Sequence, residues 1–188
     1  MITRHEVLIS LYGAWRLFLR DPRGIEWLDD SIEGFWKSFF CAVIVLPVYV
    51  FWFLVRDGEA AEAGFIRTFA VEGIAYVIAW VAWPLVMAYV APAIGRDDDY
   101  IRYIVAYNWS SGVQVAILLV VLVIEVSGLA PGGVVAIFGV IATVLVLVYH
   151  WYVLRIGLEI TGLPAAALVA GDFMLARVIH GVSQNMLQ

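Results

Sequence analysis

A polar patch interrupts one of the longest apolar stretches of the chain. It consists of Asn108, Ser110, Ser111 and Gln114, which lie within two turns of a predicted helix. Such side chains either line a polar cavity or substrate path, or they hydrogen bond to neighbouring helices and hold a bundle together. These two roles are compatible. We therefore predict a polar intramembrane site made of Asn108, Ser111 and Gln114, together with Asp172 from another apolar segment.

Three charged residues, Glu72, Asp172 and Arg177, stand in or at the mouth of apolar segments. An aspartate at the centre of a membrane helix costs about 2.5–3.5 kcal/mol on the insertion scale, so Asp172 needs a partner. Arg177 is five residues away, too far round a helix for the favoured i,i+4 pairing. The partner must come from another helix, and Arg155 and Gln114 are the candidates. Asp172 then serves a proton or substrate relay, or it is a structural buried pair or a surface residue.

Two acidic segments are similar to metal or phosphate loops. Arg96 precedes three aspartates at 97–99, which together could hold Mg²⁺ and through it a phosphate. Consecutive residues at a helix start point in different directions, so we favour a solvated turn that caps the following helix. The segment 57–62 begins like the CDP-alcohol phosphotransferase motif. Glu62 stands where that motif needs arginine, and two further aspartates are missing, so this interpretation fails.

The rest of the sequence carries no signature of catalysis or of a bound cofactor. His150 has no second histidine at helical spacing, so we interpret it as an interfacial histidine in an aromatic belt. Cys41 is the single cysteine, which excludes an internal disulfide and predicts a small hydrophobic role. Nucleophile-elbow, metalloprotease, P-loop and dinucleotide motifs are absent. We expect no metal, no cofactor and no enzymatic activity.

The elements that position these residues follow from an apolar composition. Hydrophobic residues make up 64% of the 188 residues and charged residues 14%, against about 45–50% and about 25% in soluble domains. The mean hydropathy of +0.94 leaves too little polar surface to cover a globule. The formal net charge of −5 argues against a nucleic-acid partner, which requires a basic face. We predict an all-α integral membrane protein that forms one domain over 1–188.

Four apolar runs are long enough to span a membrane, roughly 38–55, 73–94, 103–124 and 134–151. Each is close to the ~20 residues that a ~30 Å hydrocarbon layer requires. Asp30, followed by Glu33 three residues later, predicts a capping box where the helix leading into the first span begins. Pro47 near the middle of that span predicts a kink.

The segment 164–179 is a candidate fifth membrane helix. Gly162-Leu163-Pro164 is typical of a helix start, and the alanines at 165, 166, 170 and 176 favour close packing against another helix. Asp172 argues against a span, so a re-entrant or surface helix is the alternative. We favour a fifth membrane-embedded helix and expect a bundle of four to five.

A helix lying in the headgroup region is predicted at 6–20. Its apolar residues fall within about 140° of a helical wheel, and aromatic rings among them suit this depth. Five Lys/Arg lie before or at the start of the first span, two lie between the second and third, and Arg155 follows the fourth, with Arg177 left out because its side depends on the fifth segment. Two lie between the first and second spans and none between the third and fourth. The positive-inside rule therefore predicts a cytoplasmic N-terminus. We expect the membrane to be a bacterial inner membrane.

The order of several short motifs resembles a known family. Arg20-Asp21-Pro22 precedes closely spaced spans, Tyr107-Asn108-Trp109 lies early in the third, and 152–158 is followed by Gly162-Leu163-Pro164-Ala165. This layout resembles the bacterial Yip1-like membrane proteins over roughly residues 15–180. The resemblance implies about five helices, a cytoplasmic N-terminus and no catalytic residues. The Asp-Leu-Tyr-Gly-Pro signature of the eukaryotic members is missing, so no trafficking or GTPase-partner role is implied.

Three functions stay open at this point. The first is a non-enzymatic organising, assembly or accessory subunit, whose partners are membrane lipids and other membrane proteins or further copies of the chain. The second is a small transporter or permeation subunit that uses the polar patch and Asp172. The third is a metal-dependent lipid-modifying enzyme that uses the aspartates at 97–99.

Overall fold

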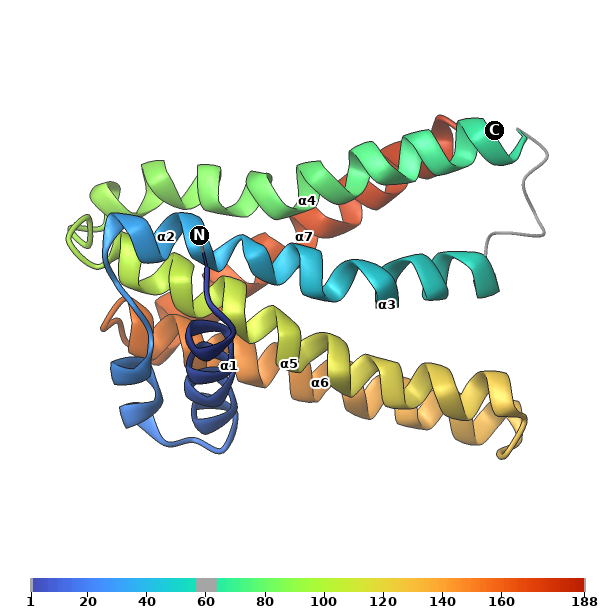
Figure 1. Cartoon of the computed structure of the whole chain (residues 1–188), viewed down its shortest axis with the longest axis horizontal. Coiled ribbons are helices and arrows are strands. Elements are labelled where there is room, and N and C mark those ends of the chain that lie inside the picture. The colour runs from blue at the N-terminus through green and yellow to red at the C-terminus, as the bar shows by residue number, and fades with distance from the viewer. Residues whose placement is uncertain (1, 57–63, 188) are drawn as a thin grey trace.

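The computed structural model describes residues 2–56 and 64–187, and every regular element in these ranges is a helix. Figure 1 shows the long helices running side by side, with α1 lying across them at one end. In chain order the elements are α1 (Arg4–Phe18), the 3-10 helix η1 (Pro22–Trp27), α2 (Ile32–Ser38), α3 (Phe40–Arg56), α4 (Phe65–Ala93), α5 (Tyr100–Ser127), α6 (Gly132–Gly157) and α7 (Gly162–Asn185).

Within residues 2–56 and 64–187, five helical segments are long and apolar enough to cross a membrane. They are Ile32–Val55, Phe65–Ala93, Tyr100–Ser127, Gly132–Gly157 and Gly162–Asn185, each 24 to 29 residues long. The first consists of α2 and α3, which are separated at Phe39, whereas Pro47 stays inside α3. The chain is an all-α integral membrane protein, and the fifth helix predicted at 164–179 is confirmed as part of α7.

The two ends of the bundle differ in what they carry (Figure 1). At the α1 end lie α1, η1, the turn between α4 and α5, and the turn between α6 and α7. At the far end lie the turn between α5 and α6 and the end of α7. Helices of these lengths measure about 36–44 Å, so their ends extend beyond a ~30 Å hydrocarbon layer.

A capping box starts α1. The Thr3 hydroxyl accepts a hydrogen bond from the Glu6 amide at 3.2 Å, and the Glu6 carboxylate accepts one from the Thr3 amide at 2.6 Å. Lys37 at the end of α2 also binds Glu6, at 2.5 Å. These bonds lower the pKa of the Glu6 carboxyl to about 2, and the bond from Lys37 contributes most.

One face of α1 packs on the bundle, and the opposite face presents large apolar side chains, as expected of an interfacial helix. The face that packs on the bundle is built from Ser10, Gly13, Ala14 and Leu17. The large apolar residues of the opposite side stay exposed: Leu8, Tyr12, Trp15 and Leu19. Because α1 lies across the spans, this exposed face suits the boundary between headgroups and acyl chains.

η1 packs against α1 through two glycines. A Cβ on Gly24 would lie 2.6 Å from the Gly13 carbonyl oxygen, and a Cβ on Gly13 would lie 2.8 Å from that of Gly24. Both are below real Cβ contacts, so only glycine permits this approach. Asp21 accepts hydrogen bonds from the Arg16 side chain and, at 3.0 Å, from the Arg23 amide. The Arg16 guanidinium holds the pKa of the Asp21 carboxyl below its usual value.

The capping box predicted at the start of α2 is wrong by one residue. The N-cap is Ser31, whose Oγ accepts a hydrogen bond from the Gly34 amide at 3.0 Å. Glu33 does not fold back onto the cap, because Lys37 lies one turn further along the same helix face and binds it at 2.7 Å. Asp30 lies outside the helix.

α5 is the central helix at the α1 end, where it packs against α1, α2, α3 and α6. Four consecutive α5 residues from Tyr103 to Ala106 are at most 1% exposed. α7 packs against α4 and α6. Towards the far end Figure 1 shows α4 with α7 on one side and α5 with α6 on the other, with α3 between them.

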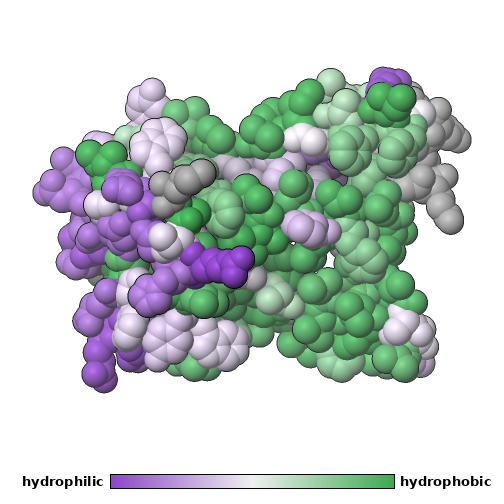
Figure 2. All heavy atoms as spheres, in the orientation of Figure 1, coloured by the Kyte–Doolittle hydropathy of each residue, from purple (hydrophilic) through white to green (hydrophobic). Residues whose placement is uncertain are grey.

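The face of the molecule seen in Figure 2 is polar mainly at the α1 end. Figure 2 shows hydrophilic residues gathered at the α1 end and hydrophobic residues covering most of the remaining face. Ile74 on α4 and Val140 on α6, for example, are 62% and 64% exposed. An apolar surface of this extent is far beyond what a soluble monomer presents, and it matches the lipid-facing side of a helical bundle.

Candidate functional site

Four spans bring polar side chains together inside the half of the bundle nearer the α1 end. The His150 Nδ1 atom on α6 lies 3.3 Å from an Asp172 carboxylate oxygen on α7. The other imidazole nitrogen lies 3.3 Å from the Tyr103 hydroxyl on α5, which accepts a 2.6 Å hydrogen bond from the Trp83 indole on α4. The Tyr107 hydroxyl donates to Asp172 at 3.4 Å. We call Trp83, Tyr103, Tyr107, His150 and Asp172 the His150–Asp172 network.

The local sequence explains why these side chains meet. Tyr103 and Tyr107 are four residues apart and therefore share one face of α5. Gly157 lets α6 approach that face, because a Cβ there would lie 3.0 Å from the Tyr103 Cα. His150 lies seven residues before the end of α6, and Asp172 ten residues after the start of α7. The short turn between these antiparallel helices therefore brings both to a depth of about 10–15 Å.

The network is shielded from its surroundings. The His150 side chain is 6% exposed and that of Asp172 18%, while Tyr103 is fully buried. Buried polar groups at this depth are costly unless they bind one another. Here every polar side-chain group of the network has a partner within hydrogen-bond range.

The donors and acceptors can be assigned from the pattern of contacts. The Trp83 indole can only donate, so the Tyr103 oxygen accepts and its own proton is free to point at His150 Nε2. His150 Nδ1 then carries the proton and donates to Asp172. The Asp172 carboxylate can take up a proton, and His150 Nδ1 can exchange its proton with that carboxylate, while the Tyr103 hydroxyl holds the other ring nitrogen in place.

A second buried carboxylate lies in the opposite half of the bundle. Glu72 on α4 is 6% exposed. It accepts a 2.8 Å hydrogen bond from the Tyr49 hydroxyl on α3 and a 3.3 Å hydrogen bond from the Gln184 amide on α7. The sequence singled out Glu72 as a costly charge, and the fold satisfies it with partners from two other spans.

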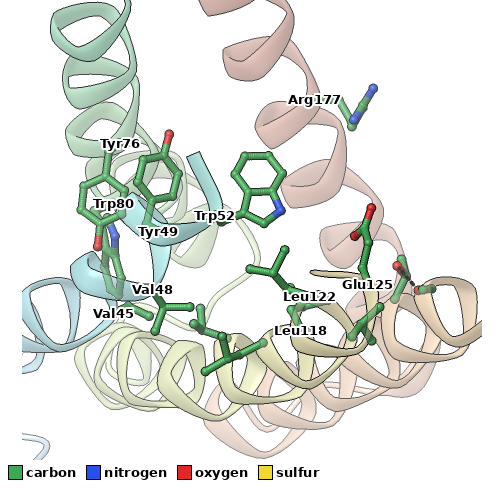
Figure 3. Close-up of a pocket in the computed structure, with 15 residues that line it drawn as sticks. Val45, Val48, Tyr49, Trp52, Tyr76, Trp80, Leu118, Leu122, Glu125 and Arg177 are labelled. Carbon is green, nitrogen blue, oxygen red and sulfur yellow. Dashed lines mark hydrogen bonds between the residues drawn. The ribbon is translucent and has the colours of Figure 1, made fainter. Parts of the chain in front are cut away.

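A cavity of about 630 Å³ lies between the five spans, towards the far end. Figure 3 shows its aromatic wall, formed by Tyr49 and Trp52 on α3 and Tyr76 and Trp80 on α4. It adjoins both carboxylate sites. Tyr49 lines it and binds Glu72, and Trp80 lines it one turn from Trp83 of the His150–Asp172 network.

The interpretation of His150 as an interfacial residue is wrong, because its side chain is buried between α5 and α7. The partners expected for Asp172, Arg155 and Gln114, are also wrong, since Asp172 binds His150 and Tyr107. One feature of the sequence does indicate the contact between His150 and Asp172. His150 and Asp172 stand at similar distances on either side of the same short turn, and antiparallel helices place such residues side by side.

Asn108 and Ser110 of the polar patch face other helices. The Asn108 amide donates to the Ser38 hydroxyl of α2 at 2.8 Å, and its Oδ1 has no hydrogen-bond partner among the described residues. The Tyr149 hydroxyl on α6 lies 2.8 Å from Ser110 Oγ and 2.7 Å from the Ala14 carbonyl oxygen of α1. These contacts hold α1, α2 and α6 to α5.

Ser111 and Gln114, the other two residues of the polar patch, make no side-chain hydrogen bond to another helix in the described part of the chain. Ser111 donates to the Tyr107 carbonyl of its own helix at 3.2 Å, and the buried Gln114 Nε2 has no hydrogen-bond partner in the described part of the chain. In residues 2–56 and 64–187, no hydrogen bond joins any two of Asn108, Ser111, Gln114 and Asp172. Asp172 instead belongs with residues that the sequence did not group with it.

The acidic segment at 96–99 has a structural role. Asp99 occupies the N-cap position of α5 without making a side-chain capping bond, so the predicted cap is wrong. It binds Arg96 at 3.3 Å and Arg102 at 2.8 Å instead, because both cations lie three residues away. Arg102 also binds Glu159 beyond α6 at 2.9 Å, which ties the two turns of the α1 end together.

The segment 57–62 lies outside the described residues. Within the described ranges, no group of three His, Cys, Asp or Glu side chains is placed to hold a metal ion. Cys41 is fully buried, as expected of a small hydrophobic residue. Comparison of the chain with protein-family models, curated proteins and solved structures found no match. Function must therefore be argued from the site.

Proposed function

We propose that the chain is a small permeation protein that passes protons across the membrane through the His150–Asp172 network. The observation that carries this proposal is the His150–Asp172 contact of 3.3 Å, buried between α6 and α7 and bounded on both sides by tyrosine hydroxyls. Ionisable residues inside a span are expensive to keep, and they mark ion and proton pathways in membrane proteins. The Asp172 carboxylate lies beside a histidine, whose ring can hold or release a proton near neutral pH, and this supports a role in proton transfer.

The proposed path uses protonatable groups at two depths. Glu72 lies in the half of the bundle nearer the far end and the His150–Asp172 network in the other half. The cavity lies between them, and its lining includes the hydroxyl-bearing Tyr49 and Thr143. Polar lining atoms in a cavity of about 630 Å³ give water molecules hydrogen-bond partners, so water can complete the path between the two carboxylates.

We propose further that the membrane is the bacterial inner membrane and that the α1 end faces the cytoplasm. Lys and Arg are concentrated in the segments that lie at this end, as the positive-inside rule requires. In this orientation His150–Asp172 is the cytoplasmic proton site and Glu72 the outer one.

Proton flux into vesicles tests the proposal. The purified chain is reconstituted with a pH-sensitive dye trapped inside, an acid step is applied outside, and valinomycin with K⁺ removes the opposing potential. We expect the wild type to acidify the lumen faster than protein-free vesicles, and Asp172→Asn to abolish the difference. Asparagine keeps the size and the hydrogen-bond acceptor of the side chain but cannot take up the proton.

Asp97→Asn is the matched control, because Asp97 is an exposed carboxylate in the turn between α4 and α5. It should conduct as the wild type does. Circular dichroism and gel filtration should show all three proteins to be equally folded. Equal flux in wild type, Asp172→Asn and protein-free vesicles would refute the proposal, and so would an Asp172→Asn variant that conducts normally.

A second candidate is a Yip1-like organising, assembly or accessory subunit without enzymatic activity. The observation in its favour is an exposed strip of small residues on α7, including Ala166, Ala170 and Gly171, beside Met174, which is 67% exposed. Small residues let another helix approach closely within a membrane. Purification in mild detergent, followed by mass analysis, should find a second copy or another membrane protein that Ala170→Trp releases. A solitary monomer in both cases would count heavily against this role.

A further inference from the structure

The side chains that line the cavity are mostly aliphatic and aromatic. Val45 and Val48 from α3 face it, Leu118 and Leu122 line it from α5, and the indole rings of Trp52 and Trp80 complete it (Figure 3). α4 packs against α7 and α5 packs against both α3 and α6, and residues from all five helices line the cavity. A lining of this kind binds the apolar body of a ligand.

One part of the rim carries charge. Glu125 extends from α5 towards α7, and Arg177 lies on α7 on that same side of the cavity (Figure 3). Arg177 stands eight residues before the end of α7, about 12 Å along the helix axis. An arginine at this depth is expensive without a counter-ion. Arg177 is exposed on the surface of α7, and within residues 2–56 and 64–187 it makes neither a salt bridge nor a hydrogen bond.

We infer that the cavity binds a single-chain anionic amphiphile of the fatty-acid type, with its chain among the α3, α4 and α5 side chains and its carboxylate on Arg177. The volume of about 630 Å³ falls within the range of about 300–1,000 Å³ for small-ligand sites, which suits one chain rather than a whole two-chain phospholipid. The planar guanidinium of Arg177 matches a carboxylate head with two parallel hydrogen bonds.

Quenching of tryptophan fluorescence by dibromostearate tests the inference on the full chain in a neutral detergent at fixed micelle concentration. Bromine quenches indoles that it touches, so a ligand in the cavity should reach Trp52 and Trp80. We expect saturable quenching by dibromostearate that falls in Trp52→Phe. Arg177→Gln should weaken the binding about tenfold or more, the range expected for losing hydrogen bonds to a charged group. Arg177→Lys keeps the charge but not the two parallel hydrogen bonds, so it should restore only part of the binding.

Three controls make the result specific. Dibromostearyl alcohol has the same chain without the charge, so its weaker quenching should not change in Arg177→Gln. Arg4→Gln removes an exposed arginine from α1 and should bind dibromostearate as the wild type does. Val48→Phe fills part of the cavity from α3 without adding an indole, and it should weaken the quenching even if the Arg177 variant folds poorly.

Equal affinity for the acid and the alcohol in the wild type would overturn the inference, as would unchanged affinity in Arg177→Gln. Tighter quenching by dibromo-phosphatidylglycerol than by dibromostearate would show that the occupant is a phospholipid and not a fatty acid. Binding is measured here without any proton gradient. A bound chain would displace the water of the proposed proton path, so the two occupants exclude each other. Each is tested in its own assay, and either proposal can fail alone.

Discussion

Replacing Tyr103 with phenylalanine probes the centre of the His150–Asp172 network. The substitution keeps the ring and removes one oxygen from a fully buried residue. That oxygen accepts the Trp83 indole proton at 2.6 Å and lies 3.3 Å from His150 Nε2. Without it, the Trp83 donor and the His150 nitrogen are left inside the bundle with no partner at that position.

The expected loss of stability follows from these two contacts. Hydrogen bonds between membrane helices contribute about 0.6 kcal/mol on average and up to about 1.7 kcal/mol in double-mutant cycles. Two average bonds give a loss of about 1 kcal/mol, and two strong ones about 3 kcal/mol. We expect the upper half of this range, because the Trp83 donor is buried and its bond is short.

Equilibrium unfolding in mixed micelles of mild detergent and dodecyl sulfate measures this loss. Tyr89→Phe on α4 is the matched control, since Tyr89 is 75% exposed and the same oxygen is lost from the surface. Combining Tyr103→Phe with Trp83→Phe should lose less stability than the sum of the single variants, because both remove the same bond. If Tyr103→Phe is as stable as Tyr89→Phe, the network does not hold the helices together as described.

Three further predictions concern the α1 end and the topology. Gly13→Ala should destabilise the contact between α1 and η1 by about 1–3 kcal/mol, because the new Cβ would lie 2.8 Å from the Gly24 carbonyl oxygen. Hydrogen exchange of the amides in residues 4–28 measures this loss of stability. The Glu6 carboxyl should titrate near pH 2 by carbon NMR, so its bond to Lys37 holds above pH 4.5 and is lost as the pH falls through about 2. In a Cys41→Ser background, Met186→Cys should react with impermeant thiol reagents from outside the cell.

Each of these predictions has its own control. Gly133→Ala in α6 places a Cβ in open space and should leave exchange unchanged. Lys37→Gln should raise the Glu6 titration midpoint, because Lys37 is the main cause of its low pKa. Ser31→Cys at the α1 end should react only after the membrane is opened. Labelling of Met186→Cys and Ser31→Cys from the same side would contradict a fifth span.

Some parts of the site were foreseeable and others were not. Asp172 and Glu72 stood out because charges within apolar runs are rare. Their partners could not be read from the sequence, since they come from α3, α5, α6 and α7 and each lies at least 20 residues away. The sequence favours an interfacial position for His150 for the same reason. A histidine near a helix end looks interfacial until the packing of the neighbouring helices is known.

The sequence by itself determined the membrane class, the spans and the interfacial helix, because hydropathy and helical periodicity are local properties of consecutive residues. It also determined which charges were unusual. Only the tertiary structure decided that Asp172 meets His150, that the α1 face with Gly13 is the one that packs, and that five spans enclose a cavity beside Arg177. These features depend on the rotation and the depth of each helix relative to its neighbours, and helix packing sets both quantities through many weak contacts that no single segment encodes.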